Sequence, residues 1–134
     1  MSKFVLEPCN DIVGKITFLK IIENTICYWN IFCLRIESEG TWEEQIDLLK
    51  SRMDEVSNSA LLPHNKFKKL DPPKTDEFEV KTGNLRAYLI LHKSAYIIMY
   101  AGKKTDQAKD LRTFRAIKKR YLEATEDDIT RKTT

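Results

Sequence analysis

The chain has 134 residues and a mass of 15.7 kDa, a length typical of one domain. Hydrophobic residues make up 42% of the sequence, which excludes disorder throughout and allows a buried core. No apolar run reaches the roughly 18 residues needed to cross a bilayer, and the first residues contain no apolar signal segment. We therefore expect a cytoplasmic protein that does not associate with membranes.

The net charge of +3 conceals an uneven distribution along the chain. Residues 1–65 contain 6 Lys or Arg and 10 Asp or Glu, whereas residues 66–122 contain 15 Lys or Arg and only 6 Asp or Glu. This excess predicts a positive surface that attracts phosphates, acidic protein segments or anionic lipids. An ordinary solvated face is the alternative interpretation.

Three β-rich runs open the chain. The residues of Lys3–Leu6, Lys15–Ile22 and Thr25–Glu37 favour strands, and Glu23-Asn24 has the composition of a hairpin turn between the last two. The first two of these runs belong to a β-rich N-terminal extension of about residues 1–25.

A helix is predicted to start at Thr41, because Thr41 and Glu44 have the spacing of a capping box. Apolar residues then recur every three or four positions, which predicts one buried helical face. These residues are Trp42, Ile46, Leu49, Met53 and Val56. Further on, Asp71-Pro72-Pro73-Lys74 predicts a stiff linker.

The second half of the chain predicts an antiparallel meander. Its strands are Phe78–Lys81, Leu85–His92 and Ala95–Ala101, with turns at Thr82–Asn84 and Lys93-Ser94.

A long helix follows the meander at roughly Asp106–Glu123. One apolar face of this helix is formed by Leu111, Phe114, Ile117 and Tyr121. Residues 1–124 are thus expected to form a single α+β domain with a mainly antiparallel sheet, a C-terminal meander, a helical insertion and a C-terminal helix. Residues 125–134 are expected to be a disordered tail.

The three cysteines, Cys9, Cys27 and Cys33, form no CxxC pair. Buried, reduced thiols are the expected state, with Cys27 and Cys33 on one face of a strand. Neither histidine lies in a metal-binding motif, and we expect no metal and no cofactor.

Cations concentrate at one end of the predicted meander. Antiparallel connectivity places Lys81, Arg86 and Lys103-Lys104 at the same sheet edge, with Tyr88 and Tyr100 two to four residues away. Arginine suits phosphate oxygens, lysine can act as a base when neighbouring cations depress its pKa, and tyrosine rings can stack on bases. Phosphate binding without catalysis explains the cations equally well.

These residues carry a resemblance to a known family. The stretch from Lys81 to Tyr121 resembles the RelE/HigB superfamily of toxin–antitoxin toxins, particularly its phage-derived HigB-like branch. The helix from Thr41 and the loop to Lys69 match the helical insertion of that family. The matching motifs are Glu79-Val80-Lys81, Leu85-Arg86-Ala87-Tyr88-Leu89-Ile90, Ile97-Ile98-Met99-Tyr100-Ala101-Gly102-Lys103-Lys104 and Lys109-Asp110-Leu111.

The resemblance implies a microbial-ribonuclease-like core that cleaves mRNA on the translating ribosome without a metal, inhibited by a cognate antitoxin with a helix-turn-helix or an acidic segment. Lys81 would be the general base, Arg86 the phosphate-binding arginine, and Lys104 would replace a common arginine. Asp110 stands where some members have a tyrosine. Further RNA contacts are expected from Lys103, Tyr88, Tyr100, Lys109 and Arg112.

Two alternatives to an active endoribonuclease stay open. The missing tyrosine and the lysine at 104 favour a catalytically silent member of the fold that binds a protein partner or RNA. A structural or phage-related protein, whose basic face only keeps it in solution, is the other alternative.

Overall fold

The predicted meander is present at the centre of the fold. A computed structural model describes residues 2–58, 62–70 and 76–133. Strands β5, β6 and β7 pair antiparallel in sequence order, and the two-residue turn at Lys93 and Ser94 has both residues at positive φ. The predicted linker Asp71-Pro72-Pro73-Lys74 lies outside the described residues.

The described residues form an α+β fold with one mixed sheet of eight strands and three α-helices. The elements, in chain order, are β1 (Phe4–Pro8), β2 (Thr17–Glu23), β3 (Ile26–Cys27), α1 (Tyr28–Glu39), α2 (Glu43–Ser57), β4 (Phe67–Lys69), β5 (Glu77–Lys81), β6 (Leu85–His92), β7 (Ala95–Lys103), the 3₁₀ turn η1 (Lys104–Asp106), α3 (Gln107–Glu123), the 3₁₀ turn η2 (Glu126–Asp128) and β8 (Ile129–Arg131).

The sheet runs in the order β4-β5-β6-β7-β2-β1-β8, and β3 pairs with β2. Most neighbours are antiparallel, as predicted, but β2 pairs parallel with β7 and β1 pairs parallel with β8. The segment predicted as an N-terminal extension therefore supplies two strands inside the sheet. It covers the edge of the meander that β7 would otherwise expose.

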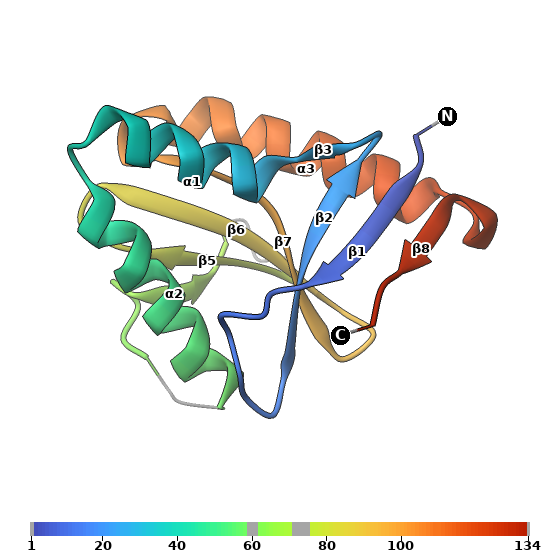
Figure 1. Cartoon of the computed structure of the whole chain (residues 1–134), viewed down its shortest axis with the longest axis horizontal. Helices are drawn as coiled ribbons and strands as arrows, with labels where there is room; N and C mark the ends of the chain where they lie inside the picture. The colour runs from blue at the N-terminus through green and yellow to red at the C-terminus, as the bar shows by residue number, and fades with distance from the viewer. Residues whose placement is uncertain (1, 59–61, 71–75, 134) are drawn as a thin grey trace.

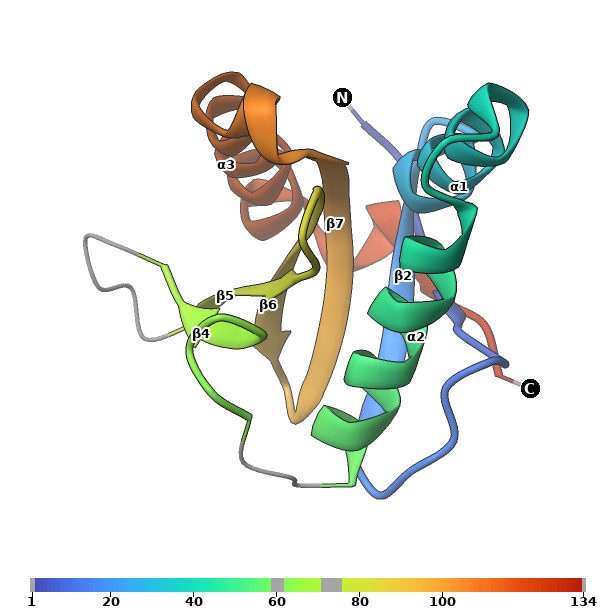
Figure 2. The same cartoon turned by 90° about the vertical axis from the view of Figure 1, so that its left-hand side faces the viewer.

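Helix α3 covers one face of the sheet, and α1 and α2 cover the other (Figures 1 and 2). The predicted apolar face of α3 is buried at Phe114, Ile117 and Tyr121, which pack against Tyr88 and Ile90 of β6. The sheet is thus enclosed between two layers of helix.

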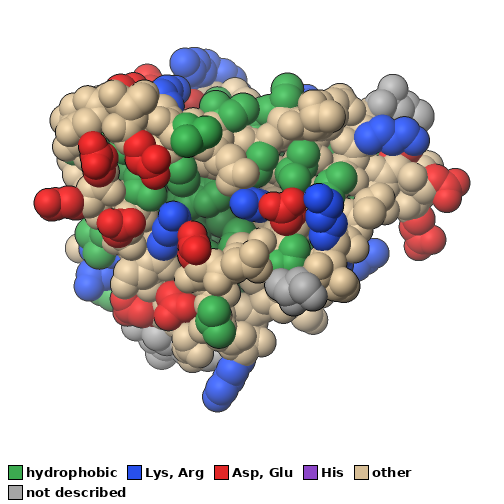
Figure 3. Space-filling model, in the orientation of Figure 1, with side chains coloured by type: hydrophobic (Ala, Val, Ile, Leu, Met, Phe, Trp, Pro, Cys, Tyr) green, Lys and Arg blue, Asp and Glu red, His purple; other side chains and the backbone are tan. Residues whose placement is uncertain are grey.

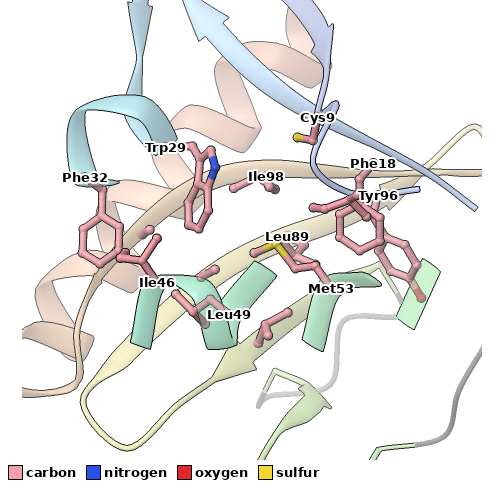
Figure 4. Close-up of a cluster of buried hydrophobic side chains, with 14 of the residues drawn as sticks. Cys9, Phe18, Trp29, Phe32, Ile46, Leu49, Met53, Leu89, Tyr96 and Ile98 are labelled. Carbon is pink, nitrogen blue, oxygen red and sulfur yellow. The ribbon is translucent and has the colours of Figure 1, made fainter. Parts of the chain in front are cut away.

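A second core lies between the sheet and α1–α2 (Figure 4). The predicted stripe of α2 is buried at Ile46, Leu49, Met53 and Val56. The predicted capping box is wrong, because α2 begins at Glu43 after Trp42 and no side chain caps it; Thr41 Oγ1 instead faces the Glu39 carbonyl at 3.4 Å.

The segment Thr25–Glu37, predicted as a strand, is mostly helix. A hairpin turn at Asn24 and Thr25 gives only the two-residue strand β3, and α1 follows at once. The buried residues of α1 are Trp29, Phe32 and Ile36, at the spacing of three and four that a helix presents to a core. Tertiary burial of this face outweighs the β-propensity of the aromatic and β-branched residues.

Part of the predicted disordered tail, Glu126–Arg131, is structured. Residues Ile129–Arg131 form β8 and pair with β1 from Phe4 to Leu6. Lys3 Nζ lies 2.5 Å from Asp128 Oδ1 and adds an ion pair across this junction. No helix among the described residues combines the length and hydropathy needed to span a bilayer.

All three cysteines are free thiols, as expected, but they do not share a strand face. Cys27 ends β3 and Cys33 lies on α1. Burial raises the pKa of Cys9 and of Cys33 to about 12, so neither is an activated nucleophile. No group of three or more Cys, His, Asp or Glu within the described ranges has a geometry that could hold a metal ion.

Candidate nucleic-acid interface

The backbone positions of the predicted site converge as antiparallel connectivity requires. Lys81 pairs with Arg86 across β5 and β6, and Arg86 pairs with Gly102 across β6 and β7. The Lys104 N–H donates to the Asn84 carbonyl at 2.8 Å. One end of the meander therefore carries all the predicted cations on neighbouring backbone.

Helix α2 holds the turn that joins β5 to β6. Gln45 Oε1 accepts from the Thr82 hydroxyl at 2.6 Å and from the Asn84 N–H at 2.8 Å, and Gln45 Nε2 donates to Asn84 Oδ1 at 2.8 Å. Arg52 of α2 donates to the Lys81 carbonyl. These bonds fix where β5 ends and β6 starts. They therefore also determine which face of the sheet each following residue of β6 occupies.

Lys103 does not join Arg86, although the sequence placed both at one edge. Lys103 pairs with Leu85, one position away from the Arg86–Gly102 pair, so its side chain points to the opposite face of the sheet. There its Nζ lies 2.7 Å from Glu39 Oε1 and 5.4 Å from the centre of the Trp42 ring. The prediction that Lys103 shares the site is wrong because the strand alternates its faces.

Arg86 is buried beneath α3 with 7% of its surface exposed. Its Nη1 donates to the Thr82 carbonyl at 2.6 Å and to the Leu85 carbonyl at 2.8 Å. Arg86 Nε has no partner among the described residues. Both hydrogen bonds use Nη1 and tie the guanidinium to the backbone of the β5–β6 turn, and the phosphate-binding role of Arg86 stays a prediction.

Lys81 shares the α3 face with Arg86 but contacts a carboxylate. Its Nζ lies 3.5 Å from Oε1 of Glu79, a residue with 1% of its surface exposed. Glu79 also accepts from Gln107 Nε2 at 2.7 Å, and Lys68 Nζ lies 3.8 Å from it. Lys81 is thus paired with a buried carboxylate that Lys68 also approaches, and its role as a catalytic base stays a prediction.

The two predicted stacking tyrosines are not exposed to bases. Tyr88 is fully buried and stacks on Phe114 with ring centres 5.7 Å apart. Burial and nearby Glu79 raise its pKa, and its hydroxyl has no partner within the described part of the chain. Tyr100 is half-buried against Tyr28, with ring centres 5.7 Å apart. Tyr88 is therefore a core residue, which corrects its assignment to RNA binding.

Asp110 packs α3 closely against β7 of the sheet. It is buried, and burial followed by the charge of Asp106 raises its pKa. Its Oδ2 lies 1.8 Å from the point where a Cβ on Gly102 would sit, so only glycine allows this approach. Gly102 is thus required for packing of the helix rather than for a phosphate-binding turn.

Four cations in this region do reach solvent. Lys104 in η1 and Lys109, Arg112 and Lys119 on α3 are exposed, and none forms an ion pair with a carboxylate among the described residues. The three α3 cations recur at intervals of three and seven, which places them on one helical face over about 15 Å. We call Lys104, Lys109, Arg112 and Lys119 the α3 basic stripe.

Two other cations of α3 are paired with carboxylates of the sheet side. Lys118 Nζ lies 2.9 Å from both Asp76 and Glu77, and Arg120 donates two hydrogen bonds to Glu23, at 2.7 and 2.9 Å. Sequence reasoning had included Lys109 and Arg112 in the site but not Lys119. The helical spacing from Arg112 to Lys119 is the signal that would have found it.

The face of the sheet opposite α3 carries acidic side chains. In Figure 3, Asp and Glu side chains gather at the left-hand end, over the junction of α1 and α2. The exposed acidic residues of these two elements include Glu37, Glu39, Glu43, Glu44 and Asp47. The uneven charge along the sequence therefore becomes a separation in space, with acidic side chains on α1 and α2 and basic ones on α3.

Comparisons with known proteins identify no relative. No family model matches the chain, and neither a curated protein nor a solved structure is significantly similar to it. The resemblance to RelE/HigB toxins accordingly depends on the short motifs alone.

Proposed function

We propose that the protein binds RNA through the α3 basic stripe without cleaving it, as a catalytically silent protein of RelE-like arrangement. The proposal rests on the difference between the buried cation Arg86 and the exposed cations of the α3 basic stripe. The arginine that the family resemblance assigns to phosphate binding is buried, whereas four other cations are exposed and form no ion pair with a described carboxylate.

The stripe has the length and chemistry for a nucleic-acid backbone. Its α3 portion extends about 15 Å, which is comparable to several consecutive phosphates of a single strand. Lysine and arginine side chains on a solvated helix face bind phosphates by releasing counterions, without base-specific contacts. The acidic side chains at the junction of α1 and α2 repel a nucleic-acid strand, so they favour its binding on the α3 face.

Binding of a fluorescein-labelled 20-nucleotide RNA, followed by anisotropy from 25 to 300 mM KCl, tests the proposal. Four phosphate contacts predict that the logarithm of the affinity falls with the logarithm of salt concentration with a slope of about −3. The triple variant Lys109→Gln, Arg112→Gln, Lys119→Gln retains one stripe cation, and its slope should be about −1.

A matched control removes the same charge elsewhere. Lys15, Lys69 and Lys132 are exposed and lie outside α3, and their replacement by Gln should leave the slope unchanged. Equal losses in both triple variants would refute a specific interface and leave only net charge.

The same reactions distinguish binding from catalysis. The RNA should remain intact throughout, in the presence and absence of ribosomes. Cleavage that disappears in Lys104→Ala would overturn the silent assignment and support the endoribonuclease interpretation.

A further inference from the structure

A hollow of about 480 Å³ lies between β1, β8, the β6–β7 turn and the C-terminal end of α3, beyond Lys119. Figure 1 shows β1, β8 and this end of α3 together at the right-hand end of the molecule. The volume is in the range of small-molecule sites.

The floor of the hollow is apolar. Leu19, Ala95 and Ile97 line it, and each has at most 2% of its surface exposed. Half-buried Ile129 and exposed Leu122 extend the apolar lining to the rim. Such a lining favours the body of an apolar ligand.

Polar donors surround this floor. Tyr121 has 4% of its surface exposed, and its hydroxyl has no hydrogen-bond partner among the described residues. Burial raises the pKa of Tyr121, so it remains a donor, and Arg131 is near enough to oppose the rise. Lys93 and Arg131 are exposed and form no ion pair with a described carboxylate. His92 packs edge-on to the Tyr121 ring at 5.7 Å.

A second hollow of the same molecule provides a contrast. It measures about 420 Å³ and lies beside Trp29 and Cys33, where Figure 3 shows hydrophobic side chains between charged ones. Its two cations are already paired, since Lys20 Nζ lies 3.4 Å from Glu7 and Lys50 Nζ lies 3.2 Å from Asp11. The first hollow, by contrast, has two unpaired cations and the single carboxylate of Glu126.

We propose that the hollow at the C-terminal end of α3 binds a small amphipathic carboxylate. The apolar chain lies against Leu19, Ala95 and Ile97. The carboxylate accepts a hydrogen bond from the Tyr121 hydroxyl and lies beside Lys93 and Arg131. The site is separate from the α3 basic stripe and does not depend on the RNA-binding proposal.

Titration of the ¹⁵N-labelled full chain with sodium decanoate, below its micelle-forming concentration, tests this site by two-dimensional NMR. Amide signals of β8, of the β6–β7 turn and of the end of α3 should shift in a saturable manner. The Trp29 indole signal reports on the second hollow and should not move. Decan-1-ol, which lacks the charge, should bind about tenfold more weakly, and acetate, which lacks the chain, should not bind.

Variants separate the contributions of the head group and the chain. Tyr121→Phe removes only the hydroxyl and should weaken decanoate binding about tenfold. Arg131→Gln and Lys93→Asn should each weaken it about two- to fivefold, because both charges are exposed; Asn also tolerates the positive φ of position 93. Ala95→Leu fills the floor and should abolish the saturable shifts.

Two controls keep the test decisive. Lys132→Gln removes the neighbouring charge, which contacts Glu7 instead, and should bind decanoate like the parent. The dispersion of the remaining NMR signals shows that each variant is folded. Equal binding of decanoate and decan-1-ol, or unchanged binding in Tyr121→Phe and Arg131→Gln together, would overturn the carboxylate site.

Discussion

Replacement of Arg86 by methionine tests whether this arginine serves the fold or a ligand. Methionine keeps much of the length and the apolar stem of the side chain but removes the guanidinium. Arg86→Met therefore deletes the two hydrogen bonds from Nη1 to the carbonyls of Thr82 and Leu85. A residue that serves only to bind phosphate would leave stability unchanged when replaced.

The expected loss of stability follows from the geometry. Hydrogen bonds from a charged donor contribute about 1.5–3 kcal/mol each, and relief of the buried charge offsets part of that, so we expect a net loss of about 3 kcal/mol. The entropy of unfolding is about 2.1 cal/mol/K per residue, or about 280 cal/mol/K for 134 residues. The melting temperature should therefore fall by about 11 °C.

Thermal unfolding followed by circular dichroism measures this shift. Lys104→Met is the matched control, because that side chain is exposed and its backbone bond to Asn84 does not depend on it. The control should melt within about 2 °C of the parent. The structural role of Arg86 would be refuted if Arg86→Met also melted within that range.

Three further changes test other parts of the fold. Arg120 and other donors lower the pKa of Glu23 to about 2, so the parent should lose stability as pH falls from about 4.5 to 2, whereas Glu23→Gln should be less stable at pH 7 and should lose less stability than the parent across that window, as urea titrations at each pH would show. Gly102→Ala should cost about 1–3 kcal/mol by urea unfolding, and adding Asp110→Ala should recover part of that loss because the two groups collide. Truncation after Ala124 removes β8 and should lower the melting temperature by at least about 3 °C; an unchanged temperature would indicate that β8 contributes nothing.

The elements with a clear period were predictable from the sequence. The meander and the apolar faces of α2 and α3 have one register that buries their large side chains, and the structure confirms them. The helix within Thr25–Glu37 was not predictable in this way, because the composition of the run favours a strand. Only Trp29, Phe32 and Ile36 have helical spacing. Gly40, which ends α1 at a φ of 70°, was the local sign of a helix terminus.

The candidate site was predictable only as far as the backbone. Antiparallel pairing placed Lys81 beside Arg86 correctly, but the side of the sheet on which Lys103 emerges depends on a one-residue difference in register. The burial of Arg86 depends on how α3 docks over β6, which is a tertiary contact. A single sequence contains no local signal for either.

The docking of α3 on the sheet also explains how charge is distributed around this helix. The sheet face beneath the helix carries the carboxylates of Glu77, Glu79 and Glu23, each with 4% or less of its surface exposed. Buried carboxylates require partners, and Lys118 and the more exposed Arg120 supply two of them from α3. These two cations are neutralised by the fold, so the positive field of the basic half of the sequence concentrates on the outer side of the helix. Under the proposed function, an anionic partner approaches α3 from solvent, because Arg86 and Asp110 are both buried at the end of the meander beneath the helix.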